Sequence, residues 1–106
     1  MKSEMTATMA EIKFAPGQVV YHDELGYRGV IVEVDDCYRG TSDDPTGGRG
    51  PRRQPWYHIL LDGSTEIIYV SQRFLQADPS GKPVSHPLIS SLFNSFENGR
   101  YTRLNH

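Results

Sequence analysis

The chain has 106 residues, 37% of them hydrophobic, and carries 11 Lys and Arg against 13 Asp and Glu. This length is typical of one domain with its own core, and the formal net charge of −2 is unlike the basic charge typical of strong nucleic-acid binders. The single cysteine, Cys37, excludes an intramolecular disulfide and a cysteine-based zinc site. No apolar run approaches the roughly 18 residues of a transmembrane helix, so we expect no membrane partner.

The N-terminal residues 1–12 are expected to form a flexible tail. Met1, Met5 and Met9 lie at helical spacing in it, and the alternative is a small docking stripe. The segment has neither the apolar stretch of a secretory signal nor the arginines of a mitochondrial presequence. We therefore expect a cytoplasmic protein, and the single cysteine agrees with a reducing compartment.

Two strands are predicted in the first third of the chain. Pro16-Gly17 is a turn signal, and residues 19–22 then have the composition of a short strand. Residues 29–36 alternate over a longer strand. Alternation places Val30, Val32 and Val34 on one face of it and Ile31, Glu33 and Asp35 on the other.

Residues 39–55 differ in composition from the rest of the chain. They hold four Gly, three Pro, four Arg and two Asp, and no apolar or aromatic residue. Such a segment cannot bury enough surface to offset the entropy lost on ordering. We expect a mobile functional loop or a disordered insertion.

A hairpin and then a helix are predicted in the second half. Residues 56–62 are largely apolar on both faces, which is typical of a central strand, and Gly63-Ser64 turns the chain into a partner strand, 65–71. A short 3₁₀ turn is expected at 73–75. Pro87 and Asn98-Gly99 bound a predicted helix, with one apolar stripe formed by Leu88, Ile89, Leu92, Phe93 and Phe96. The last residues, 102–106, are expected to be a second tail.

Several short strands and one late helix predict a mainly β protein, a small β-barrel with a C-terminal accessory helix spanning residues 13–101 as one domain. An open sheet with the helix lying on one face fits the same pattern. No catalytic set is recognisable. Asp35 and Asp36 are adjacent, so on a strand they point to opposite faces and cannot form an acid–base pair.

Metal ligation is not expected either, although two weak arrangements exist. Glu33 and Asp35 share a strand face and could hold a hard cation, but charged residues at a strand end more commonly discourage edge pairing. His22 and His58 lie on different predicted strands without a metal-ligand spacing. We interpret them as hydrogen-bonded histidines, with an enzyme that uses His58 and a carboxylate as the minor alternative.

Two sets of side chains are candidates for binding. The arginines of the Gly-rich segment could pair with phosphates, or they could neutralise nearby acids: Arg39, Arg49, Arg52 and Arg53. The aromatic residues near strand ends suit a peptide-binding groove, a contact between copies of the chain, or, for Tyr57 and Tyr69, the core: Tyr27, Tyr38, Trp56, Tyr57 and Tyr69.

Four blocks of sequence carry a resemblance to a known family. They are GQVVYH (17–22), LGYRGVIVEVDDCY (25–38), QPWYHILLDG (54–63) and IIYVSQRFL (67–75). Together they resemble the HspQ family, also called the YccV-like or hemimethylated-DNA-binding domain. The resemblance covers residues 14–101, and residues 86–101 resemble the C-terminal helix of many members. It implies an SH3-like barrel without enzymatic activity or a cofactor.

The resemblance implies two functions. One is a heat-shock protein that promotes degradation of denatured proteins as a specificity factor for the Lon protease. The other is binding to hemimethylated DNA. The residues expected to contact a protein partner lie in the family blocks: Tyr27, Arg28, Tyr38, Trp56 and His58. Arg39, Arg49, Arg52 and Arg53 are expected to contact DNA under the alternative.

Overall fold

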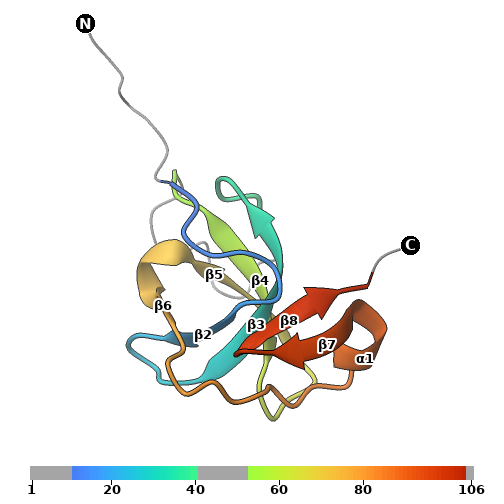
Figure 1. Ribbon diagram of the computed structural model, residues 1–106. Coiled ribbons are helices and arrows are strands. Elements are labelled where there is room, and N and C mark those ends of the chain that lie inside the picture. Colours follow the sequence, from blue (N-terminus) through green and yellow to red (C-terminus); the bar gives the residue numbers. More distant parts are fainter. Residues whose placement is uncertain (1–10, 41–52, 105–106) are drawn as a thin grey trace, which may run out of the picture.

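The computed structural model describes residues 11–40 and 53–104, which form two antiparallel sheets (Figure 1). Strands of the larger sheet lie in the order β5-β4-β3-β2-β6. Their bounds are β2 Val19–His22, β3 Arg28–Asp35, β4 Trp56–Leu61, β5 Ile67–Ser71 and β6 Leu75–Ala77. The smaller sheet pairs β7 (Phe93–Glu97) with β8 (Arg100–Arg103), and the short helices are η1 (Gln72–Phe74) and α1 (Ile89–Leu92). Neither helix in the described part of the chain is long enough to cross a membrane.

The four predicted strands are confirmed as β2 to β5 of the larger sheet, whereas its fifth strand, β6, was not predicted. The segment 56–62 corresponds to β4, which lies between β3 and β5 as expected of a strand with two apolar faces. The hairpin partner begins at Ile67 rather than at residue 65, so its turn is longer than two residues. Gly63 adopts a φ of +77° in this turn, a conformation that favours glycine.

The prediction of a closed barrel is wrong. β5 and β6 are the two edges of the larger sheet, and only the three residues of η1 separate them in sequence. So short a connection requires the sheet to curl until its edges approach each other. Among the described residues, however, β5 and β6 form no pairing, so the larger sheet stays open.

The inner face of the curled sheet holds the main core. Its buried members come from every strand of the sheet and from the segment before β2: Phe14, Val20, Ile31, Tyr57, Ile59, Val70 and Leu75. Their burial excludes water from the concave side, which supplies the main driving force for folding.

A buried glutamine at the start of η1 ties the N-terminal segment to this core. The Gln72 side-chain oxygen accepts hydrogen bonds from the Tyr57 hydroxyl and from the Lys13 backbone N–H, the latter at 2.9 Å. Its amide nitrogen donates to the Glu11 carbonyl at 2.8 Å. Because these bonds satisfy the Gln72 amide, burial of this polar group carries little penalty.

A bulge in β3 changes which residues face the core. The register places one extra residue of β3 between the pairs Ile31–Ile59 and Glu33–His58. Beyond the bulge Val34 packs against the inner core, whereas Val30 belongs to a cluster on the outer face. The predicted common face for Val30, Val32 and Val34 is therefore wrong, because the extra residue shifts the alternation by one position.

The β7–β8 hairpin covers one half of the outer face (Figure 1). Six buried residues form the cluster between the hairpin and the sheet: Val19, Val30, Leu60, Val84, Phe93 and Tyr101. Tyr101 holds this unit together, because its backbone N–H donates to the Gly17 carbonyl at 2.8 Å. Its hydroxyl also accepts from the Val84 N–H at 2.9 Å.

The predicted helix over 87–98 is wrong beyond its first residues, because α1 ends at Leu92 and a hairpin follows. Asn98 and Gly99 have φ values of 56° and 75°, which is the geometry of a two-residue hairpin turn rather than a helix cap. Phe93 and Phe96 of β7 are three residues apart, a spacing that also matches a helix. A bulge between Phe93 and Ser95 lets both rings pack on the same cluster.

The C-terminal segment 102–106 was expected to be a tail, but β8 extends to Arg103. The Arg103 guanidinium donates to the Val32 carbonyl, at the bulge of β3, over 3.1 Å. The hairpin is thus attached to the sheet at the irregular point of β3.

We expect Gly17→Ala to destabilise the fold strongly. Gly17 has a φ of +92°, and a Cβ on it would overlap the carbonyl oxygen of Tyr101. Together strain and overlap should cost about 2–4 kcal/mol of unfolding free energy, measured by urea denaturation. Gly63→Ala is the matched control, because Gly63 has a φ of +77° with no atom within 4 Å, and should cost about 1 kcal/mol. Equal losses would contradict the tight contact with Tyr101.

Candidate functional site

The half of the outer face that the hairpin leaves uncovered carries a group of polar and aromatic side chains. We call it the open-face cluster, and its members are Asp35, Tyr38, Trp56, His58 and Tyr69. Asp35 pairs with Trp56 across β3 and β4, and His58 pairs with Tyr69 across β4 and β5. Because side chains alternate along strands, these four residues point to the same side of the sheet.

Asp35 is the hydrogen-bonding centre of this cluster. One carboxylate oxygen accepts from the Tyr69 hydroxyl at 2.7 Å and lies 3.2 Å from Nε2 of His58. The Tyr69 hydroxyl in turn accepts from the Arg39 backbone N–H at 2.9 Å. Burial, and then the hydrogen bond to Asp35, raise the pKa of Tyr69 far above its ordinary value. The network thereby fixes the chain that leaves β3.

Aromatic rings pack around this centre, edge to face for Tyr38 and Trp56 and tilted for His58 and Tyr69. The Tyr38 ring lies 4.8 Å from the Trp56 ring, and the His58 ring lies 4.5 Å from the Tyr69 ring. Only 1% of the surface of Trp56 is accessible, so this residue supports the cluster from beneath. Tyr38, His58 and Tyr69 are half-buried and form the accessible part of the cluster. The structure therefore brings together three of the predicted protein-contact residues: Tyr38, Trp56 and His58.

Tyr27 lies at the opposite end of β3, apart from the open-face cluster. Its ring lies 4.9 Å from that of His22, which stacks on Phe74 at 5.4 Å. Nδ1 of His22 accepts from the backbone N–H groups of Glu24 and Leu25, so this histidine shapes a turn. Burial lowers the pKa of His22, which favours the neutral ring that this bonding requires.

Arg28 also lies away from the cluster, and its guanidinium is used within the fold. It forms ion pairs with Asp62 at 3.1 Å and with Asp78 at 2.9 Å, and it donates to the Lys82 carbonyl at 2.7 Å. Burial raises the pKa of Asp78, but hydrogen bonds from Ser80 and Arg28 outweigh this effect and leave the pKa lowered. Arg28 thus ties the 78–83 segment to the sheet.

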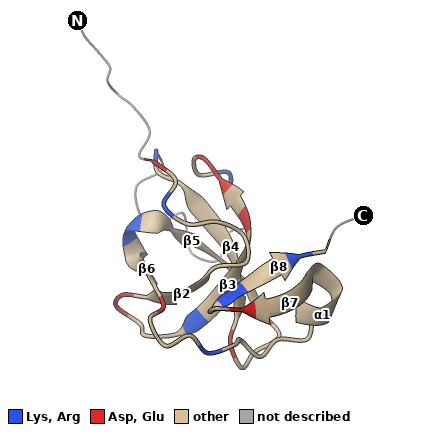
Figure 2. Ribbon diagram, viewed as in Figure 1, with Lys and Arg blue, Asp and Glu red and all other residues tan. Residues whose placement is uncertain are grey.

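Two of the four arginines expected to contact DNA belong to the described residues. Arg39 and Arg53 are exposed, and Arg49 and Arg52 lie outside the described residues. The Arg39 guanidinium pairs with Asp36 at 2.8 Å, and this hydrogen bond lowers the pKa of Asp36. Figure 2 shows acidic and basic residues interspersed along the ribbon, with acids at the end of β3.

Asp35 was missed as a site residue from the sequence, because it was assigned to a solvated strand end. Tyr69 was left open between a binding groove and the core, and it was not among the residues expected to contact a protein partner. The structure separates Tyr69 from the core, because Tyr69 shares its strand face with exposed Ile67 and not with buried Val70. Asp35 could not be identified, since its partners depend on the pairing of three strands.

The chemistry available to the cluster is limited. Asp35 orients the His58 ring as a carboxylate orients a catalytic histidine. Within residues 11–40 and 53–104, however, no Ser, Thr or Cys side chain forms a hydrogen bond with His58. His22 and His58 lie on opposite faces of the sheet, and no group of at least three His, Cys, Asp or Glu residues in the described ranges could hold a metal ion.

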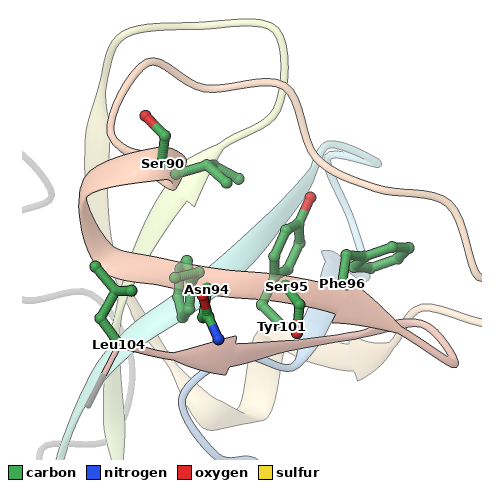
Figure 3. A pocket seen from close by; sticks show the side chains of 8 residues that line it. Ser90, Asn94, Ser95, Phe96, Tyr101 and Leu104 are labelled. Atoms are coloured by element: carbon green, nitrogen blue, oxygen red, sulfur yellow. The ribbon is translucent and has the colours of Figure 1, made fainter.

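A second feature is a hollow between α1 and the β7–β8 hairpin (Figure 3). Its volume is about 400 Å³. Its walls combine apolar side chains with small polar ones: Ile89, Phe93, Phe96, Leu104, Ser90, Asn94, Ser95 and Tyr101. Among the described residues that line it, Tyr101 alone is ionisable, and its hydroxyl is bonded to Val84.

A family model described as "Hemimethylated DNA-binding protein YccV like" matches residues 12–100. The match includes the whole larger sheet, the open-face cluster and most of the β7–β8 hairpin.

We expect Tyr69→Phe to change the response of the fold to alkali. The raised pKa of Tyr69 means that its stabilising effect is complete below pH 10 and is lost as the pH rises toward the folded-state pKa. The unfolding free energy of the variant should therefore fall less steeply above about pH 10 than that of the original chain. At neutral pH the variant should lose about 1–2 kcal/mol, because two hydrogen bonds are removed.

The matched control is Tyr21→Phe on β2, whose hydroxyl forms no hydrogen bond to any residue in the described ranges. It should lose less unfolding free energy at neutral pH than Tyr69→Phe, because no hydrogen bond is removed. Identical slopes for Tyr69→Phe and the original chain, measured by denaturant titration at several pH values, would contradict the role assigned to Tyr69.

Proposed function

The chain belongs to the YccV-like family, and from this premise we propose that it is a non-enzymatic binding module that acts on proteins. In this proposal it is a cytoplasmic, heat-shock-type specificity factor that promotes degradation of denatured proteins by the Lon protease. The observation that supports a protein partner best is the open-face cluster, where Tyr38, His58 and Tyr69 present aromatic surface beside the Asp35 carboxylate.

The composition of this surface favours protein over nucleic acid. Tyrosine and histidine combine apolar area with a polar atom, which suits protein interfaces. Asp35, Asp36 and exposed Glu33 make the end of β3 acidic, and a phosphate backbone would be repelled there. Arg39, the basic residue nearest in sequence, is already paired with Asp36.

The mechanism we propose is a shift of population by differential affinity. A specificity factor that binds a denatured client and the active state of its protease more tightly than the resting state increases the active fraction. This action needs no bond-making group in the factor. It requires a surface that accepts exposed apolar segments, which the aromatic side chains of the open-face cluster supply.

Binding to hemimethylated DNA is the second candidate, and the description of the matching family supports it. The residues that would contact phosphates are Arg39, Arg49, Arg52 and Arg53. Arg39 would have to exchange Asp36 for a phosphate, which adds a cost to binding.

We also propose that the curled sheet is a variant of the SH3-like barrel. The support is the strand order, in which a four-strand meander continues through a 3₁₀ turn to a fifth strand beside the first.

A degradation assay with purified Lon and an unfolded client tests the leading proposal. Addition of the protein should accelerate client turnover. Replacing Tyr38 and His58 together by Ala should reduce this acceleration about tenfold, because interface aromatic residues commonly carry a large share of binding energy. Gln76→Ala, an exposed position on β6, is the control. Turnover that the protein leaves unchanged, with no binding to either component, would refute the proposal.

A binding titration with three otherwise identical duplexes, hemimethylated, fully methylated and unmethylated, tests the second candidate. Under this proposal the hemimethylated duplex binds most tightly, and affinity falls steeply with salt. Replacing Arg39, Arg49, Arg52 and Arg53 by Gln should flatten the salt dependence. Equal affinity for all three duplexes would remove the methylation claim, and absent binding would remove the DNA claim.

A further inference from the structure

The outer edge of β5 has no paired strand within residues 11–40 and 53–104. Among the described residues β5 pairs with β4 alone, so its second side has no neighbour. Ile67, at the start of this strand, is 52% exposed, and Tyr69, two residues later, is half-buried in the open-face cluster. The open edge therefore adjoins the candidate site.

The backbone groups that face this edge can be identified from the register. Leu61 donates to the Glu66 carbonyl at 3.1 Å, and Gln72 donates to the Pro55 carbonyl at 2.9 Å. Residues 66, 68, 70 and 72 therefore direct their main-chain groups toward β4. Ile67 and Tyr69 alternate with them, so their N–H and C=O groups point outward.

Natural proteins commonly protect edge strands with a bulge, a proline or a charged side chain. β5 has the sequence IIYVS and pairs with β4 without a register shift, so it carries none of these devices. The opposite edge, β6, has only three residues, whereas β7 is bulged and β8 carries two arginines. β5 is thus the least protected edge in the described part of the chain.

We propose that an extended segment of a denatured protein adds to β5 as a new strand, bonded through the main-chain groups of Ile67 and Tyr69. The inference deepens the proposed function and rests on it. Main-chain pairing accepts many side-chain sequences, which suits a module whose clients have unrelated sequences. The side chains of such a segment would meet Tyr69 and the rest of the open-face cluster on one side.

Charge defines the class of segment further. Residues 54–72 contain Asp62 and Glu66 and no Lys or Arg. Asp35 and Glu33 lie on the same face as Tyr69. A strand that alternates apolar residues with Lys or Arg is therefore complementary to this edge, and an acidic strand is repelled.

Hydrogen exchange of the full chain tests this inference. The probe is lysozyme, a basic protein, kept unfolded by reduction and alkylation, and its native form with intact disulfides is the matched control. The unfolded form should slow exchange at the amides of Ile67 and Tyr69 about tenfold, and the native form should leave both rates unchanged. Protection of these two amides supports the inference.

Three outcomes would overturn it. Binding of unfolded lysozyme with protection confined to other strands would exclude β5 as the docking edge and leave the proposed function standing. Protection that depends on the concentration of the protein alone would assign the edge to a second copy. Failure to bind any unfolded protein would remove the proposed function together with the inference.

A pair of variants separates the edge from its surroundings. Ile67→Lys places a positive charge on exposed β5 and should weaken binding of unfolded lysozyme about tenfold. Thr65→Lys adds the same charge in the exposed turn before β5 and should bind nearly as well as the original chain. Equal weakening by both variants would show a general charge effect and contradict strand addition.

Discussion

A single curled sheet has to bury apolar residues on both of its faces. The inner face curls around a core that includes Ile31 and Tyr57. The outer face is apolar over only half its length, and the β7–β8 hairpin covers that half through Phe93 and Tyr101. The bulge in β3 stands between the two halves and, by adding one residue, keeps Val34 inward and Asp35 outward. The uncovered half can therefore be polar without exposing the core.

Polar side chains fix the segments that the apolar core does not hold. Gln72 bonds the N-terminal segment, Arg28 bonds the 78–83 segment, and Arg103 bonds the bulge of β3. Each of these bonds joins residues far apart in sequence. They attach three segments to the sheet whose strands carry Asp35, Trp56, His58 and Tyr69 of the open-face cluster.

The sequence predicts β2 to β5 because alternation is a local property. It fails where two structures share one pattern. A spacing of three between Phe93 and Phe96 fits a helix and a bulged strand equally, and Asn98-Gly99 serves as a helix cap or a hairpin turn. Tyr38, Trp56 and His58 could be named from family blocks. The link between Asp35 and Tyr69 spans 34 residues and emerges only from the pairing of three strands.

The proposed function requires that partners meet the protein at the open-face cluster, and Asn94 in the hollow beside α1 offers a control position. Site-specific photo-crosslinking tests this requirement most directly, with a benzophenone side chain placed at position 38 in one variant and at position 94 in another. In a mixture with Lon and an unfolded client, we expect position 38 to crosslink to one or both of these proteins and position 94 to crosslink to neither. Crosslinks from position 94 alone would contradict this requirement.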